Sequence, residues 1–157
     1  MKVSRSTVLG ALMLALAMPG HAHDFAKGDL RIGHPWTRAT ASGQKVAAGY
    51  LDIVNAGKVA DRVIGASTPA AERIELHVVG LEGEVMRMRE VKSFEVPAGG
   101  RMELKPRGPH MMIMGIKRAF RKDERIPVTL RFEKAGDVAI ELLVSGIDTP
   151  AEGEHKH

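Results

Sequence analysis

The chain has 157 residues, which is enough for one domain with a single buried core. It contains no cysteine, so cysteine nucleophiles, thiolate metal ligands and disulfide bonds are excluded. Only six residues are aromatic, and they form no stacking cluster with basic residues, which argues against nucleic-acid binding.

Residues 1–22 have the features of a cleaved secretory signal peptide. Lys2 and Arg5 provide a positive start, residues 8–18 form an apolar run, and small residues precede a cleavage position after Ala22. The run is too short to span a bilayer, so we expect no stable membrane insertion. Cleavage removes two positive charges, which lowers the formal net charge from +4 to +2 and leaves no charge excess that indicates a partner.

We expect the exported protein to have one folded domain at residues 23–147 and a polar tail at residues 148–157. Segments of alternating or β-branched residues, separated by turn residues, predict strands at 30–34, 46–55, 62–67, 72–79, 84–91, 94–97, 101–104, 110–114, 126–133 and 138–144. Pro35 should end the first strand. Only residues 119–125 have the character of a helical turn. This spacing predicts an all-β fold, an antiparallel barrel or sandwich.

The strands at 72–79 and 84–91 form a predicted hairpin. Apolar and polar residues alternate in the first strand, and His77 lies on its polar face. The glycines at 80 and 83 turn the chain, so that Met88 on the returning strand would approach His77 across the hairpin.

Methionines gather around two histidines in this part of the chain. All six methionines beyond residue 22 lie between residues 86 and 114, and five of them, all but Met102, are candidate soft ligands beside the two histidines. His110 and Met112 are two residues apart on a predicted strand and therefore point to one face. Imidazole and thioether together suit copper, and Cu(I) in particular, because thioether is a soft donor. A methionine cluster that merely fills the core is an equally open interpretation of these residues.

Sequence signatures of enzymes are missing. The chain has no G-x-S-x-G elbow, no phosphate-binding glycine loop and no H-E-x-x-H motif, so we expect no catalytic residues and no enzymatic activity. The alternative is a copper-dependent redox enzyme or a Cu(II) scavenger. Either would use His23 as the mature N-terminus, where amine and imidazole together chelate Cu(II), and the tail residues His155 and His157.

The metal-ligand spacing resembles a known family signature. His77, ten residues, Met88, twenty-one residues, His110, one residue and Met112 match the pattern of the PCuAC family of periplasmic copper chaperones. Further similarity lies in HPWTRAT at 34–40, AAGYLDIVN at 47–55, GEVMRMR at 83–89, VPAGGRMELKP at 96–106 and GPHMMIMGIKR at 108–118. One departure is Val78, where many members have a second methionine.

The resemblance implies a cupredoxin-like β-barrel that binds Cu(I) through His77, Met88, His110 and Met112. It also implies a chaperone that delivers copper toward the CuA site of cytochrome c oxidase, to subunit II or to another assembly factor. We expect handover by stepwise ligand exchange at an exposed site. Met86, Met111 and Met114 would then be spare or neighbouring groups, and the tail would offer a possible second site for Cu(II).

Overall fold

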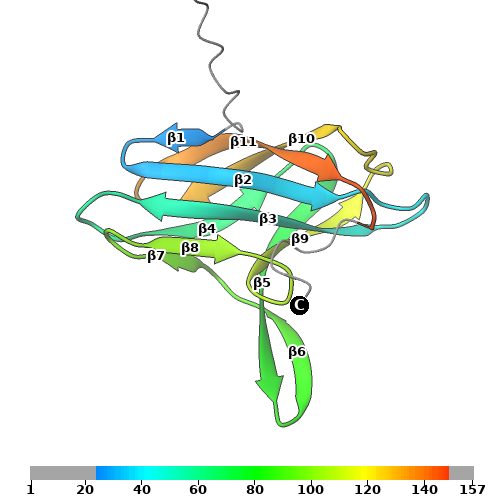
Figure 1. Ribbon diagram of the computed structural model, residues 1–157, viewed down its shortest axis with the longest axis horizontal. Helices are drawn as coiled ribbons and strands as arrows, with labels where there is room; N and C mark the ends of the chain where they lie inside the picture. The colour runs from blue at the N-terminus through cyan, green and yellow to red at the C-terminus, as the bar shows by residue number, and fades with distance from the viewer. Residues whose placement is uncertain (1–23, 149–157) are drawn as a thin grey trace, which may run out of the picture.

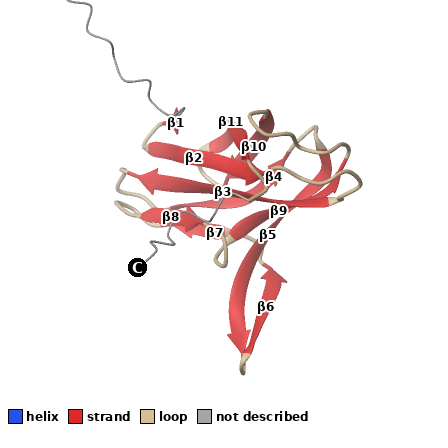
Figure 2. Cartoon of the chain, turned by 45° about the vertical axis from the view of Figure 1, so that its right-hand side comes forward, coloured by secondary structure: helices blue, strands red, loops and turns tan. Residues whose placement is uncertain are grey.

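The protein is all-β. A computed structural model describes residues 24–148, and this part of the chain contains eleven strands and no helix (Figures 1 and 2). The prediction of an all-β fold is therefore confirmed. The strands are β1 (Phe25–Lys27), β2 (Leu30–Arg38), β3 (Val46–Asn55), β4 (Asp61–Ser67), β5 (Ala71–Glu82), β6 (Val85–Glu90), β7 (Phe94–Val96), β8 (Arg101–Leu104), β9 (His110–Ile116), β10 (Arg125–Phe132) and β11 (Gly136–Ser145).

The strands form one continuous sheet that curls back on itself. Its order is β6-β5-β9-β3-β2-β11-β10-β4-β7, with β1 paired to β2 and β8 paired to β3. Every pairing is antiparallel except that of β11 with β2, which is parallel. Strand β7, at one end of the order, contacts β3 and β8, so the two halves of the sheet face each other.

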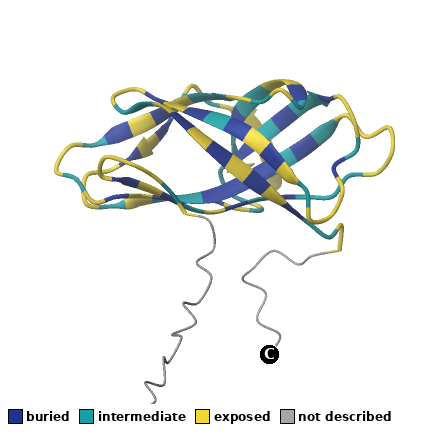
Figure 3. Ribbon diagram, turned by 90° about the horizontal axis from the view of Figure 1, so that it is seen from above, coloured by how far each residue is buried: buried dark blue, intermediate teal, exposed yellow. Residues whose placement is uncertain are grey.

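The core lies between these facing halves. Buried and exposed residues alternate along β10 and β11, as expected for strands with one face inward. Figure 3 shows buried and exposed segments alternating along the ribbons of the sheet. Leu130 and Leu142 on these strands meet Ile53 and Met111 from the other half within one cluster of buried side chains. The outer face of β9, β3 and β5 points away from this core.

Two predictions of local structure were wrong. Strand β2 does not end at Pro35 but continues to Arg38, because a register shift between Gly33 and Trp36 accommodates the proline, which has no N–H to donate. The segments at 94–97 and 101–104 are strands as predicted, and β7 pairs with β4 while β8 pairs with β3. Residues 119–125 form a turn and an extended lead into β10 rather than a helical turn.

The β5–β6 hairpin projects away from the barrel (Figures 1 and 2). Residues 71–77 of β5 pair with β9, whereas residues 77–82 pair with β6. Every residue of β6 is exposed. His77 belongs to both pairings and is the point at which β5 leaves the barrel.

Candidate metal centre

The two histidines lie side by side where β5 leaves the barrel. His77 on β5 is directly opposite His110 on β9, and their ring centroids are 5.8 Å apart. Residues that face each other in an antiparallel pair project to the same side of the sheet. Both imidazoles therefore lie on the outer face of the barrel, away from the core on the other side.

The two predicted methionine ligands flank this histidine pair. Met112 is opposite Glu75, two residues before His77, and Met88 is opposite Val79, two residues after His77. Because side chains two residues apart share a face, both methionines are on the same face as the histidines. The structure thus brings His77, Met88, His110 and Met112 to one face of three neighbouring strands, each methionine one diagonal step from His77.

The four side chains differ strongly in their access to solvent. His110 is 4% exposed and Met112 is half-buried, whereas Met88 on the projecting hairpin is 51% exposed. The His77 side chain, at the junction, is 14% exposed. The group is therefore anchored in the barrel wall on one side and open on the side of the hairpin.

The loop before β9 determines which nitrogen of His110 is available. The Nδ1 atom is 2.9 Å from the Gly108 carbonyl oxygen, and since a carbonyl only accepts, Nδ1 must carry the hydrogen. The loop itself is closed by hydrogen bonds from the Lys105 N–H to the Pro109 carbonyl and from the Gly108 N–H to the Lys105 carbonyl. A lone pair for a metal is thus left on Nε2 of His110.

In His77 the hydrogen-bonded nitrogen is Nε2, whereas in His110 it is Nδ1. The Nε2 atom of His77 is 2.9 Å from Oε2 of Glu75, and the Nδ1 atom of this ring is buried with no hydrogen-bond partner among the described residues. The guanidinium of Arg73 donates to Oε1 of the same carboxylate at 2.7 Å. The hydrogen bond from Arg73, and next that with His77, lower the pKa of Glu75, so this carboxylate is ionised at neutral pH. A buried nitrogen without a partner is uncommon, and a metal ion bound at that atom is one explanation of it.

Aromatic residues support His110 from the barrel side. The Tyr50 ring lies 6.4 Å from the His110 ring, and the Trp36 ring lies 4.6 Å from the Tyr50 ring at an interplanar angle of 40°. Burial raises the pKa of Tyr50, an effect that Arg38 partly offsets, so the phenol is neutral. No role at the site was predicted for Tyr50 or Glu75 from the sequence. The signal for Glu75 was its position two residues before His77 on the polar face.

The remaining methionines separate into two groups. Met86 is opposite Leu81 and Met114 is opposite Arg73, so both extend the row on the ligand face. Met111 lies on the other face and is fully buried in the core. Met111 was expected to be a spare or neighbouring group of the site. Because the alternation of the strand turns its side chain inward, it cannot serve as a spare ligand.

The donor set determines which ions suit the site. No group of three or more His, Asp or Glu side chains within residues 24–148 is arranged to hold a metal ion. Magnesium and calcium, which require several oxygen ligands, are unsuited to such a surface. Two imidazole nitrogens with thioether sulfurs are instead typical of soft ions such as Cu(I).

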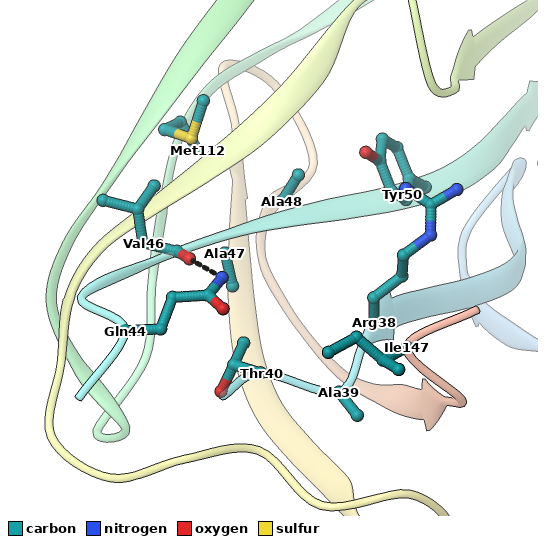
Figure 4. Close-up of a pocket in the computed structure, with 10 residues that line it drawn as sticks. All are labelled: Arg38, Ala39, Thr40, Gln44, Val46, Ala47, Ala48, Tyr50, Met112 and Ile147. Carbon is teal, nitrogen blue, oxygen red and sulfur yellow. Dashed lines mark hydrogen bonds between the residues drawn. The ribbon is translucent and has the colours of Figure 1, made fainter. Parts of the chain in front are cut away.

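A hollow of about 320 Å³ adjoins the site at Met112 (Figure 4). Its walls include Arg38 and Tyr50, and the Gln44 amide closes one side by donating to the Val46 carbonyl. Of the four predicted ligands only Met112 lines it. The hollow therefore adjoins the candidate metal centre and is separate from it.

Comparison with known proteins places the chain in a family. Residues 30–144 match the sequence profile of a lipoprotein-like family described as LpqE-like. The chain belongs to the LpqE-like family. One LpqE-like relative, the lipoprotein-like Lxx21020 of Leifsonia xyli subsp. xyli (strain CTCB07), is 33% identical over 139 residues, which are 83% of this chain and 82% of the relative.

Solved structures similar to this LpqE-like chain include PCuAC domains. The copper-bound PCuAC domain from PmoF2 is 28% identical with a TM-score of 0.70, covering 79% of this chain and 98% of that domain. The apo PCuAC domain from PmoF1 is 26% identical with a TM-score of 0.68, covering 79% and 99%. The solution structure of CuI-DR1885 from Deinococcus radiodurans shares the fold at 23% identity and a TM-score of 0.60, covering 79% and 81%. The predicted cupredoxin-like fold and the resemblance to PCuAC domains are confirmed.

Several sequence predictions fall outside residues 24–148. The signal peptide, the N-terminal His23 and the tail residues His155 and His157 are not among the described residues. Nothing within the described range is a helix long and apolar enough to cross a membrane.

Proposed function

We propose that this LpqE-like chain is a copper chaperone that binds one Cu(I) ion through His77, Met88, His110 and Met112. The observation that carries the proposal is the adjacent histidine pair with a methionine on either diagonal, all on one face. The similarity to a copper-bound PCuAC domain supports it. No sequence or structural feature of the described residues favours catalysis, and we infer a carrier rather than an enzyme.

The ligand types explain both binding and release. Thioether sulfur selects a soft ion, and the absence of cysteine leaves no thiolate to hold the ion strongly. An acceptor with thiolate ligands would then have the stronger donor set. Copper would pass from this chain to such an acceptor without any need for the carrier to unfold.

The gradient of exposure suggests the order of handover. Met88 is the most exposed of the four ligands and lies on the hairpin that projects from the barrel. We propose that an acceptor side chain first replaces Met88, while His110 and Met112 retain the ion until a second acceptor ligand binds. The CuA site of cytochrome c oxidase subunit II, or another assembly factor, is the acceptor we propose.

We further propose that the chaperone is exported and acts in the periplasm. The lipoprotein-like relatives and the signal-like residues 1–22 support this location. In this proposal residues 23–147 form the copper-binding domain. The tail at 148–157 and His23 would at most bind Cu(II) separately from the His/Met site.

Anaerobic competition for Cu(I) against a chromophoric chelator tests the proposed site. The processed protein should carry His155→Ala and His157→Ala in every sample, so that the tail contributes no ligands. One tight equivalent is expected, and His110→Ala with Met112→Leu should abolish it. Met102→Leu is the matched control, because Met102 is on β8 outside the cluster. Equal Cu(I) binding by all variants would contradict the proposal.

A further inference from the structure

Three hydrogen-bonded side chains lie in a row along the polar face of β5, beside the proposed copper site. Arg73 donates to Oε1 of Glu75 at 2.7 Å, and Oε2 of Glu75 is 2.9 Å from Nε2 of His77. In register, Arg73 faces Met114, Glu75 faces Met112 and His77 faces His110. This row on β5 therefore lies alongside a row of β9 side chains that contains two of the proposed ligands.

The Glu75 contact determines the state of the His77 ring. A carboxylate can only accept, so in a neutral imidazole the hydrogen must be on Nε2. The lone pair is then on Nδ1, which is the buried atom that has no partner among the described residues. His110, directly opposite, has the reverse arrangement, because the Gly108 carbonyl requires the hydrogen on Nδ1.

We propose that Glu75 is a positioning residue that holds His77 with Nδ1 directed at the copper ion, so that the two histidines bind through different nitrogens, Nδ1 of His77 and Nε2 of His110. This inference rests on the proposed function and deepens it. Carboxylates that accept from the non-ligating nitrogen of a histidine fix its tautomer and orientation at metal sites. Arg73 acts one step further out by holding the carboxylate of Glu75.

A surface ion pair without this role is the competing explanation of the same contacts. Arg73 is 57% exposed, as expected for such a pair, but the Glu75 and His77 side chains are only 20% and 14% exposed. Glu90 provides a matched control, since it faces His77 from β6 and brings a second carboxylate to the same face. The hydrogen bond of His77, however, goes to Glu75.

The tautomer of His77 in the metal-free protein is the first test. Nitrogen-15 NMR of histidine-labelled protein at mildly alkaline pH distinguishes protonated from unprotonated ring nitrogens. We expect hydrogen on Nε2 of His77 and on Nδ1 of His110 in the wild type and in Glu90→Gln. Glu75→Ala should give a mixture of His77 tautomers while His110 is unchanged, which also reports that the fold is intact. Glu75→Gln should retain the wild-type tautomer, because its amide oxygen still accepts.

Cu(I) affinity is the second test. Loss of such a positioning partner typically weakens metal binding about 10- to 100-fold, and we expect this for Glu75→Ala but not for Glu90→Gln. On binding, the unprotonated nitrogen whose resonance shifts should be Nδ1 in His77 and Nε2 in His110.

Hydrogen on Nδ1 of His77 in the wild type, or unchanged affinity in Glu75→Ala, would overturn the inference. A wild type that binds no Cu(I) would instead overturn the proposed function, while the metal-free tautomers still decide the role of Glu75.

Discussion

Two adjacent methionines, Met111 and Met112, should separate folding from copper binding. Met111 is fully buried and packs on the inner face of β9, next to Gly49 of β3. Met112 is half-buried on the outer face opposite Glu75 and Ala48. Substitution of either residue by leucine or by alanine therefore gives four variants with opposite expectations.

The expected losses of unfolding free energy depend on how deeply each side chain is buried. Removing a fully buried methionine side chain costs about 2–5 kcal/mol of unfolding free energy, because a cavity remains in the core. Met111→Ala should thus be strongly destabilising, whereas Met111→Leu, which keeps the volume, should cost less than about 1.5 kcal/mol. Both Met112 variants should be milder than Met111→Ala. Only the Met112 variants remove a proposed ligand, and leucine removes it while preserving the apolar volume.

Chemical denaturation and Cu(I) competition on the same four proteins provide the assay. We expect Met111→Leu to bind Cu(I) as the wild type does and Met112→Leu to bind it at least tenfold more weakly, at nearly equal stability. Equal loss of Cu(I) affinity in Met111→Leu and Met112→Leu would refute the assignment of the two faces. A Met112→Ala variant as unstable as Met111→Ala would refute it as well.

Three further perturbations test other parts of the structure. Gly49→Ala should destabilise the fold by about 1–3 kcal/mol in denaturant unfolding, because an added Cβ would lie 3.0 Å from the Met111 side chain and 3.2 Å from that of Leu142; wild-type stability would contradict this packing. Burial alone would raise the pKa of Asp61, but hydrogen bonds from the backbone N–H groups of Lys134, Arg62 and Ala135 lower this pKa below its ordinary value of about 3.8. The ionised carboxylate therefore stabilises the fold above that pH. This stabilisation is lost as the pH falls through the folded-state pKa. Unfolding measured from neutral to strongly acidic pH should show this loss in the wild type and a flatter profile in Asp61→Asn, and parallel profiles would refute it. Met88→Leu should accelerate Cu(I) transfer to a chelator in stopped-flow absorbance with little change in stability, because Met88 is exposed on the hairpin, and an unchanged transfer rate would count against its role in release.

Strand periodicity was sufficient to predict much of this fold. The alternation in β10 and β11, and in the first part of β5, predicted strands whose inward faces are now found in the core. The two-residue spacing of His110 and Met112 likewise predicted a shared face, because strand geometry alone determines it. Strand periodicity and the shared face of residues two apart depend only on neighbouring residues, so the local sequence is enough to predict them.

Pairing partners and side-chain contacts were not predictable in the same way. The separate pairing of β7 and β8 depends on how the whole sheet curls, and turn residues between two strands carry no information about it. The bulge at Pro35 depends on a partner strand that tolerates a register shift. The hydrogen bond between Glu75 and His77 depends on rotamers that alternation does not specify, so the sequence indicated the shared face but not the contact.

The methionine methyl resonances of the processed protein report directly on whether Met88 and Met112 bind Cu(I). Carbon-13 methyl-labelled methionine would be followed by NMR during anaerobic addition of one equivalent of Cu(I). We expect the Met88 and Met112 signals to shift and saturate at one equivalent, while those of Met102 and the buried Met111 do not respond. Unshifted Met88 and Met112 signals in the presence of bound Cu(I) would show that copper binds elsewhere and would contradict the proposed ligand set.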